Sequence, residues 1–519
     1  MKKLILLALL VIAAGCTTTP TTTVNSTPTG SPTPGAAADV PYSITLQGFS
    51  ISGFPGVHSA VVAGTPDKLL VFGGRRNGLH GFPGGHQAQA GPAFPTTEAN
   101  DTIYALNLTT KTLLGSASVG TLPAKIANQM KATNLQYEMR NGWLYVMGGY
   151  GPGPQGSLTT LGYVTVINFD ALATAVINNQ PLNAAFAAAN IVQFDHPALA
   201  ITGGDLKLLP DGAQGPMFVL AFGQQYDGQY TPGGGLVNQN YADGVRVFQF
   251  AGTDKPTGIT FVNSIPNPPG TQMDPENQFH RRDLTMEASV DASGNRRLVA
   301  YGGVFKGGRF EGFLNPVFVN SATNTVTVTA NTTTTQLMSQ YDTAAIQLYD
   351  NVAKIIYTTL LGGISQYYWD STTNSLKRDP VDIAKGIDGL PFINTVSTLK
   401  MPTSNDTGSQ YLHVGQTFPP GGGTLPMCSS GTGPLIQAPL GGAETKFVIA
   451  SGVQQVTPGV VTLNSITSTS VVGYLVGGIA ATVPYSANGP TCASNMFYTV
   501  TLNPTQPTNT IKLQAPAGP

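Results

Sequence analysis

The sequence predicts an all-β protein built from repeated four-stranded units, and three observations support this prediction. Only 10% of the 519 residues are charged, while 62 are glycine and 39 are proline. Frequent glycine and proline favour many short strands joined by turns over long helices. A hydrophobic content of 41% is enough for a large core. The third observation is an internal repeat, which identifies repeat architectures before any single motif does.

The first 16 residues are predicted to be a lipoprotein signal peptide. Three residues with two lysines precede an apolar run, residues 4–14, that is too short to span a bilayer as a helix. The run ends in Ala13-Ala14-Gly15-Cys16, which resembles the lipobox of bacterial lipoproteins. The resemblance implies a diacylglycerol on Cys16 and, in a Gram-negative host, sorting to the outer membrane. An ordinary secretory signal with a chance cysteine is the alternative.

Residues 17–40 are predicted to be a disordered tether. They are mostly threonine, proline, serine, glycine and alanine, and residues 17–38 carry no charge. Such a segment cannot bury enough apolar surface to offset its ordering entropy. We therefore expect a folded domain over residues 41–519, held by its lipid anchor at the outer membrane or cell surface, outside the cytoplasm.

Six apolar strands that end in, or near, a pair of glycines reveal the repeat. They lie at residues 68–74, 143–149, 217–224, 297–303, 355–363 and 472–478. A strand precedes most of them across a short turn, and further strands follow, as at residues 102–108 and 113–119. Four antiparallel strands in each unit make a blade of a β-propeller.

A strand that ends in two glycines resembles the kelch family of β-propellers, over about residues 42–515. The third repeat departs from the pattern, with Gly223-Gln224 in place of the pair. We favour six blades, and a seventh around residues 446–453 stays open as an alternative. The strand at residues 43–51 is expected to close the ring by pairing with residues 496–502 and 510–513, which would remove a free sheet edge.

The chain is also similar to secreted bacterial kelch-like proteins of unassigned activity. Other kelch relatives are copper-radical oxidases and a sialic-acid epimerase. The oxidases use histidines from late in the chain, whereas only His413 follows His280 in this sequence. We therefore expect no metal site and no cofactor. The resemblance to the epimerase implies basic and acidic groups at the channel mouth.

The predicted loops divide between the two ends of the ring. Connections between the first and second and between the third and fourth strands of each blade look short. Connections between the second and third strands, and from one blade to the next, look long. Long loops carry function disproportionately, so the long-loop face is expected to be the binding face. Cys428 and Cys492 both fall on long loops and are expected to form a disulfide, with two free thiols as the alternative.

Ten residues of the long-loop face are candidate ligand contacts. In a chain so poor in charge, the run from His280 to Asp283 is conspicuous, because two guanidiniums can hold a carboxylate or an acidic sugar in bidentate fashion. The competing interpretation is an Arg–Asp pair that ties neighbouring blades together. The candidates are Arg75, Arg76, His80, Gln225, Tyr226, His280, Arg281, Arg282, Asp283 and Tyr367.

These observations favour a binding protein over an enzyme. The net charge of −1 provides no basic footprint for a nucleic acid. Metalloprotease, serine-hydrolase, paired-cysteine and phosphate-loop motifs are missing from the sequence. We expect a surface-exposed lipoprotein that binds a glycan or a protein through the long-loop face. The alternative is a sugar-modifying enzyme, an isomerase or lyase, that uses Arg281, Arg282, Glu276 and Asp283.

Overall fold

The structure is a computed structural model, and it describes most of the chain after residue 38. The chain divides into two units, residues 1–38 and 39–519, and all described residues belong to the second. The described ranges are 39–80, 93–212, 215–230, 239–252, 255–266, 276–322, 325–382, 385, 387–429, 434–485 and 489–516. The predicted signal peptide, Cys16 and nearly all of the tether lie outside these ranges. Val40 was assigned to the tether, but it is fully buried in the core.

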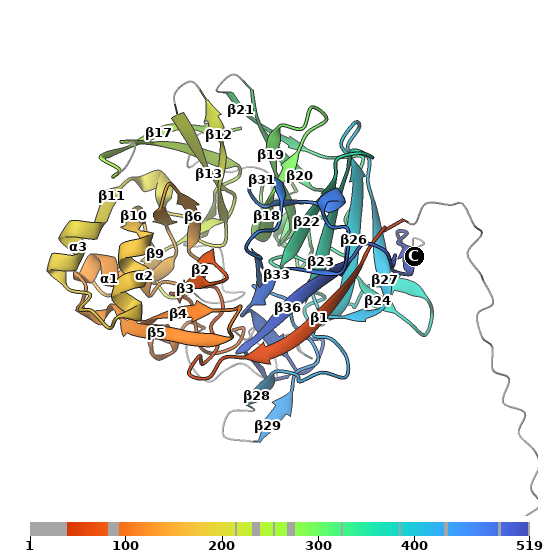
Figure 1. The fold of residues 1–519 in the computed structure, drawn as a ribbon, viewed down its shortest axis with the longest axis horizontal. Coiled ribbons are helices and arrows are strands. Elements are labelled where there is room, and N and C mark those ends of the chain that lie inside the picture. The colour runs from red at the N-terminus through yellow and green to blue at the C-terminus, as the bar shows by residue number, and fades with distance from the viewer. Residues whose placement is uncertain are drawn as a thin grey trace, which may run out of the picture. The chain divides into compact units, whose positions relative to one another are not determined.

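Six sheets of mainly antiparallel strands surround a central axis and confirm the all-β propeller (Figure 1). Five of them have four strands. From the innermost strand outward, the first blade consists of β2 (Val61–Thr65), β3 (Lys68–Phe72), β4 (Thr102–Asn107) and β5 (Thr112–Ser118). The second consists of β6 (Gln136–Arg140), β7 (Trp143–Met147), β10 (Tyr163–Asn168) and β11 (Ile191–Asp195). The third consists of β12 (Asp205–Gly212), β13 (Gly215–Ala221), β16 (Val245–Ala251) and β17 (Gly258–Ile265).

The fourth blade consists of β18 (Arg282–Val290), β19 (Arg296–Val304), β20 (Val317–Ala322) and β21 (Thr325–Ala330). The sixth consists of β30 (Lys446–Ile449), β33 (Ser470–Val476), β36 (Met496–Asn503) and β1 (Ser43–Ser50). Between them lies a seven-stranded sheet, whose blade is β22 (Ala345–Asp350), β23 (Ile355–Ile364), β26 (Phe392–Pro402) and β27 (Ser409–Thr417). The sheet also contains β31 (Gln455–Thr457) and β32 (Val460–Thr462) at its inner edge and β37 (Thr510–Lys512) at its outer edge.

The core of the propeller is itself a ring. The innermost strands β2, β6, β12, β18, β22 and β30 each contact the next, and β30 contacts β2. Six apolar clusters lie between successive blades. Second strands are therefore buried on both faces, as in β7, where all five residues are buried. Residues 446–453, considered above as a seventh blade, instead begin with the innermost strand of the sixth.

The glycine pairs end the second strand of each blade in a left-handed conformation. At Gly74, φ is +76°, and an added Cβ would lie 2.1 Å from the carbonyl oxygen of His58. In the third blade the residues with this geometry are Phe222 (φ +58°) and Gly223 (φ +82°). The register predicted from Gly223-Gln224 is therefore off by one residue, because a phenylalanine occupies the first position of the pair.

Ring closure was predicted correctly in one part and wrongly in the other. Strand β1 pairs with β36 along its whole length, from Ser43 opposite Asn503 to Ser50 opposite Met496. Strand β37, however, pairs with β27 of the fifth blade and not with β1. The N-terminal strand thus supplies the outer strand of the last blade and links both ends of the described chain.

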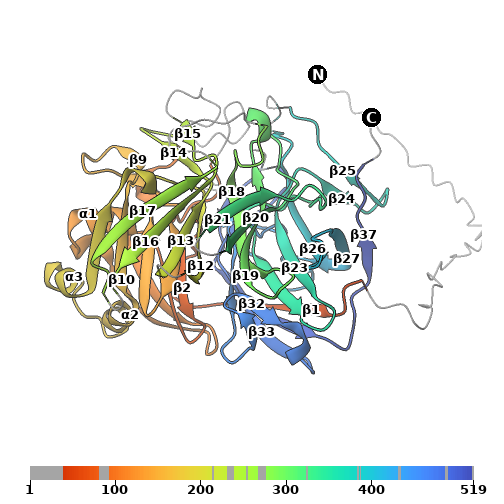
Figure 2. The same cartoon turned by 90° about the horizontal axis from the view of Figure 1, so that it is seen from above.

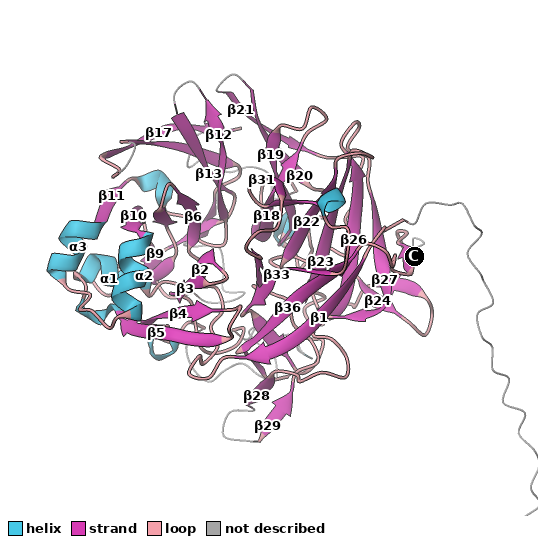
Figure 3. Cartoon of the chain, viewed as in Figure 1, coloured by secondary structure: helices cyan, strands magenta, loops and turns pink. Residues whose placement is uncertain are grey.

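Long insertions occur at both ends of the ring, so the prediction of a single long-loop face was wrong. Helices α2 (Phe169–Ile177) and α3 (Ala184–Asn190) connect the third and fourth strands of the second blade, and Figure 3 shows them with α1 (Ala124–Met130) at one side of the ring. Residues 450–469, between the first and second strands of the sixth blade, contain β31 and β32. Figure 2 shows β32 and α2 at the end of the ring opposite β14 (Gln224–Tyr226) and β15 (Gln239–Tyr241).

The remaining long loops at the end that carries β14 contain short hairpins. They are β8 (Tyr150–Pro152) with β9 (Leu158–Thr160), β24 (Tyr368–Asp370) with β25 (Ser375–Lys377), β28 (Met427–Ser429) with β29 (Leu435–Gln437), and β34 (Ile479–Ala481) with β35 (Thr491–Ala493). We call this end the mouth of the central channel. No helix among the described residues is long and apolar enough to cross a membrane.

Candidate ligand-binding site at the channel mouth

A hollow of about 1000 Å³ lies at the mouth, where the innermost strands begin. All six blades contribute to its lining, through the loops that lead into the inner strands and those that follow the glycine pairs. A second hollow, of about 690 Å³, continues along the channel and shares Ser59, Asn134, Asp283, Asp342 and Glu444 with the first. We call the first the mouth hollow and the second the inner channel.

Aromatic rings form much of the wall of the mouth hollow. Tyr230 is at their centre, with its ring centroid 5.1 Å from Tyr226, 5.4 Å from Phe94 and 5.2 Å from His80. The Tyr150 hydroxyl donates to the Gly228 carbonyl (2.6 Å) and accepts from the Tyr230 amide (2.8 Å), which fixes the loop that carries Tyr230. Phe305 and Tyr341 complete the aromatic lining.

Arg282 is the cation at the centre of the site. Its Nη1 lies 3.2 Å from Asp283 Oδ2, its Nη2 donates to the Tyr230 hydroxyl at 3.2 Å, and its guanidinium lies 4.4 Å from the centre of the Phe305 ring. The side chain is buried, yet its Nε makes no hydrogen bond to any described residue. A buried donor without an acceptor is costly, but this nitrogen exposes almost no surface, so a ligand oxygen reaches it only if neighbouring side chains move.

His58 contributes a second unsatisfied nitrogen to the lining. Its Nδ1 lies 2.9 Å from Ser59 Oγ and 3.8 Å from Glu444 Oε2. Its Nε2 is buried and has no hydrogen-bond partner among the described residues. Arg75 lies next to it through a β-bridge and stacks on Phe94 at 4.8 Å. Burial lowers the pKa of Arg75 to about 10, which leaves it charged at neutral pH.

Four carboxyl groups line the mouth hollow: Asp283, Asp342, Asp388 and Glu444. Burial raises the pKa of Asp283, and the charge of Arg282 opposes the rise. Burial also raises the pKa of Asp342, against the charge of Lys446, which lies 3.3 Å away. Burial alone would raise the pKa of Glu444 too, but its interactions with the neighbouring His58 and Ser59 reverse the shift and lower the pKa. The hollow therefore holds carboxyl groups whose pKa values are shifted in opposite directions.

Below the mouth, the inner channel contains further charged side chains that the inner strands point toward the axis. Asp205 and Lys207 of β12 lie 3.7 Å apart, and Glu287 comes from β18 and Lys446 from β30. Burial raises the pKa of Glu287 to about 7, with Lys207 opposing the rise. A chain with so few charges thus concentrates many of them around its axis.

Five of the ten predicted contacts line the mouth hollow, and five do not. Those that line it are Arg75, His80, Tyr226, Arg282 and Asp283. Outside it lie Arg76, Gln225, His280, Arg281 and Tyr367. Arg76 is exposed and donates to the Thr97 carbonyl, while Gln225 is replaced in the lining by its neighbour Gln224, because successive strand residues face opposite sides. The amide of Tyr367 donates to Ser365 Oγ, and its side chain packs on the core of the fifth blade.

His280 and Arg281 instead form the seam between the third and fourth blades. His280 Nδ1 lies 2.6 Å from Asp243 Oδ1, and its ring stacks on Tyr241. Arg281 is fully buried, and its guanidinium donates to three carbonyl oxygens and one side-chain amide oxygen, on Gln278, Gly302 and Asn315. The predicted grip of two adjacent guanidiniums on one ligand is therefore not formed. The alternative, that this segment ties blades together, describes His280, which bonds to Asp243 of the third blade. The guanidinium of Arg281 instead bonds only within the fourth blade and the loop that leads into it.

Sequence reasoning missed several lining residues, above all His58, Tyr230, Asp342 and Glu444. For Glu444, the distribution of charged residues along the sequence does contain a signal. Between residues 414 and 511, Glu444 and Lys446 are the only charged residues. Two charges so isolated, on alternate positions entering a strand, indicate side chains with a function at the axis. Asp342 and Tyr230 carried no comparable signal, because their loops are not distinctive in sequence.

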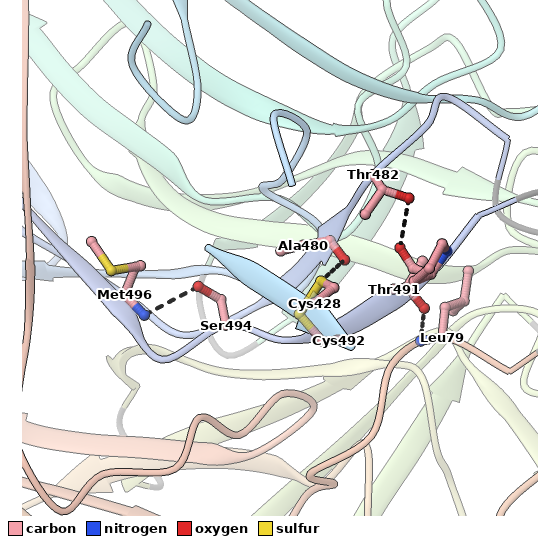
Figure 4. Close-up of a disulfide and its surroundings, with 9 residues drawn as sticks. Leu79, Cys428, Ala480, Thr482, Thr491, Cys492, Ser494 and Met496 are labelled. Atoms are coloured by element: carbon pink, nitrogen blue, oxygen red, sulfur yellow. Dashed lines mark hydrogen bonds between the residues drawn. A yellow bond between two sulfur atoms is a disulfide. The ribbon is translucent and has the colours of Figure 1, made fainter. Parts of the chain in front are cut away.

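The predicted disulfide between Cys428 and Cys492 is present (Figure 4). It joins β28 to β35, next to the loop that brings Arg75 and His80 into the hollow. This loop bridges to Cys492 at Asn77, and the amide of Leu79 donates to Thr491 Oγ1 at 2.9 Å. The disulfide therefore supports one wall of the mouth. No group of three or more histidine, cysteine, aspartate or glutamate side chains in the described ranges is arranged to hold a metal ion.

Comparisons with known proteins add little beyond the fold. No protein-family model matches the sequence, and no curated protein is similar to it. Among 170 solved chains that match the structure is the structure of YjhT, with a TM-score of 0.42 and 10% sequence identity. The match covers 85% of this chain and 94% of YjhT. A likeness of this size says nothing about function, and the kelch resemblance stays a prediction.

Proposed function

We propose that the mouth hollow binds a sugar residue of a glycan. The observation that carries this proposal is the lining of the mouth hollow, which combines aromatic walls with Arg282, His58 and four carboxyl groups. Sugar hydroxyls both donate and accept hydrogen bonds, and C–H faces of a sugar pack on aromatic rings. A lining that combines donors, carboxylate acceptors and tyrosine rings suits such a ligand better than a purely apolar one.

The lining supports recognition of hydroxyl groups without requiring an acidic sugar. Arg282 already has Asp283 as a partner, Arg281 is used in the seam, and four carboxyl groups face the hollow. An anionic ligand would have to approach these carboxyl groups. A neutral or weakly charged sugar can instead accept from Arg282 and donate to Asp283 or Glu444.

We propose further that the terminal residue of the glycan enters, and not an internal segment. Residues 450–469 occupy the end of the channel opposite the mouth, where β32 adds to the inner edge of β22 in parallel register and Gly459 packs against Ala288 of β18. Arg296 Nη1 donates to the Pro458 carbonyl and fastens this insertion. A chain threading through the ring would have to displace it.

For the location, we propose export followed by lipidation at Cys16 and anchoring at the outer membrane or cell surface. The lipobox-like sequence before Cys16 supports this proposal. The disulfide supports it independently, because disulfides persist in oxidising compartments outside the cytoplasm. Metabolic labelling with a fatty-acid analogue tests it. Label should appear on the wild type and be lost with Cys16→Ser.

A printed array of bacterial and plant glycans tests the binding proposal. The wild type should bind a defined set of glycans, Arg282→Ala should lose them, and Arg76→Ala should keep them, because Arg76 is exposed and outside the hollow. Tyr230→Ala and Tyr367→Ala form a second pair with the same expected contrast. A wild type that binds no glycan, or binding that survives Arg282→Ala unchanged, would overturn the proposal.

A second candidate function is proton transfer to and from the bound sugar, as in an isomerase or lyase. The opposite pKa shifts of Asp342 and Glu444 favour it, because paired carboxyl groups with separated pKa values are suited to act as acid and base. Incubation of array-positive sugars in deuterated water, followed by NMR, tests it. Deuterium incorporation or a new anomer should appear with the wild type and disappear with Asp342→Asn and Glu444→Gln, whereas unchanged spectra would rule it out.

A further inference from the structure

A separate depression lies on the fifth blade, away from the mouth hollow. It has a volume of about 550 Å³ and shares no lining residue with the mouth hollow. Its walls come from the hairpin β24–β25, the start of β26 and the segment before residue 486. Four aromatic side chains line it: Tyr368, Trp369, Phe392 and Tyr485.

Asp379 is the one carboxylate in this depression. Its residue is only 9% exposed, and it accepts hydrogen bonds from the hydroxyls of Tyr368 and Tyr485. No lysine, arginine or histidine among the described residues lies within ion-pair distance of it. The nearby Arg378 is engaged with Glu311 at 3.3 Å. A buried carboxylate without a counter-ion is costly, since two neutral phenols compensate only part of its charge.

The charge of Asp379 affects the pKa of the two tyrosines beside it. Burial, followed by the charge of Asp379, raises the pKa of Tyr485 to about 12, and the same two causes raise the pKa of Tyr368. Both phenols therefore stay protonated and keep donating to the carboxylate. With Trp369 and Phe392 they make the lining aromatic, and the negative quadrupole of an aromatic face attracts a cation.

We propose that this depression binds an organic ammonium group, with Asp379 as its counter-ion and the aromatic side chains as its walls. A quaternary ammonium of the choline type suits the site best, because it has no N–H to satisfy and gains from contact with several rings. The same chemistry occurs in a free small molecule and in a choline-containing lipid headgroup. This ammonium site is independent of the proposed function of the mouth hollow.

Titration of the full chain with choline chloride, followed by tryptophan fluorescence, tests the proposal. The protein has two tryptophans, and Trp143 is buried in the second blade, so a change on titration reports on Trp369. The wild type should show a saturable change with choline and with tetramethylammonium, but none with sodium chloride at equal ionic strength. Asp379→Asn should weaken choline binding at least tenfold.

Two controls keep the test decisive. Asp370→Asn removes a half-buried carboxylate of the same hairpin that accepts from Thr372 and Thr373 in the turn, and this variant should bind as the wild type does. Tyr485→Leu should lose binding, and Tyr485→Phe should retain most of it. Thermal unfolding of each variant shows whether it is folded. Sedimentation with phosphatidylcholine and phosphatidylglycerol vesicles distinguishes the two sources of the ligand. No saturable change with choline, or equal affinity in folded Asp379→Asn, would overturn the proposal.

Discussion

Arg281 and Arg282 are adjacent in sequence but belong to two different regions of the molecule. Arg281 lies in the seam between the third and fourth blades, where carbonyl and amide oxygens saturate its guanidinium. Arg282 lies in the mouth hollow, where Asp283 and the phenols of Tyr230 and Tyr241 are its partners and its Nε is left without one. The guanidinium of Arg281 holds the fourth blade to the loop that enters it, whereas that of Arg282 borders the hollow in which a ligand would bind.

The difference follows from strand geometry. Arg281 precedes β18 and Arg282 opens it, and their side chains point to opposite sides, as successive residues of an extended segment do. The alternation ends at Asp283, which has a left-handed φ of +52° and lines the hollow beside Arg282. The same alternation places Gln224 in the hollow and Gln225 outside it. A run of charged residues can therefore contain both structural residues and residues that face the ligand site. Within such a run, a structural residue serves as the control for its ligand-facing neighbour.

The largest effect is expected from the seam. Arg281→Met keeps the length of the side chain but leaves several buried oxygens without a donor. We expect the free energy of unfolding to fall by about 3 kcal/mol, because each unsatisfied buried group costs on the order of 1–3 kcal/mol. Urea denaturation followed by circular dichroism measures it. An unchanged midpoint would mean that these hydrogen bonds of Arg281 do not stabilise the fold.

The next effect concerns the mouth. Arg282→Ala should weaken binding of an array-positive glycan about 10- to 100-fold, since a hydrogen bond to a charged donor contributes about 1.5–3 kcal/mol. Its effect on the free energy of unfolding should be smaller than that of Arg281→Met. Isothermal titration calorimetry and urea denaturation, run on both variants, measure the two quantities. If Arg282→Ala unfolds the protein while Arg281→Met abolishes binding, the two roles have been assigned the wrong way round.

The pH dependence of stability tests the electrostatics below the mouth. The pKa of Glu287 rises from its ordinary 4.5 to about 7 in the folded protein. Between these values the folded state retains a proton that the unfolded state has lost, so stability falls as pH rises and levels off above pH 7. Glu287→Gln should remove about 3 kcal/mol of this fall. Urea midpoints from pH 4.5 to 8 measure it, and parallel curves for variant and wild type would contradict the buried, protonated Glu287.

The smallest effect is expected from the two glutamines of β14. Gln224→Ala should weaken glycan binding about fivefold, the contribution of one neutral hydrogen bond, while Gln225→Ala should leave it unchanged. Calorimetry with the same glycan measures both variants. Equal losses in the two would show that the lining does not follow the alternation along the strand.

The architecture could be predicted from the sequence because the glycine-ended strands repeat. The register of the third blade could not, since Phe222 adopts the left-handed conformation that glycine has elsewhere. Helices α2 and α3 were missed because the connection between β10 and β11 was assumed to be short. Only five of the ten candidate site residues line the mouth hollow, because the inward or outward direction of a loop side chain depends on contacts across blades that a single sequence does not contain.

The central claim is that a sugar residue occupies the mouth hollow and satisfies Arg282 and His58. A crystal structure of the protein soaked with its tightest array-positive glycan tests this claim most directly. We predict that one terminal sugar ring lies against Tyr230, with oxygen atoms within hydrogen-bond distance of Arg282 Nε and His58 Nε2. Electron density for the sugar only outside the hollow, with these two nitrogens still unpartnered, would contradict the account.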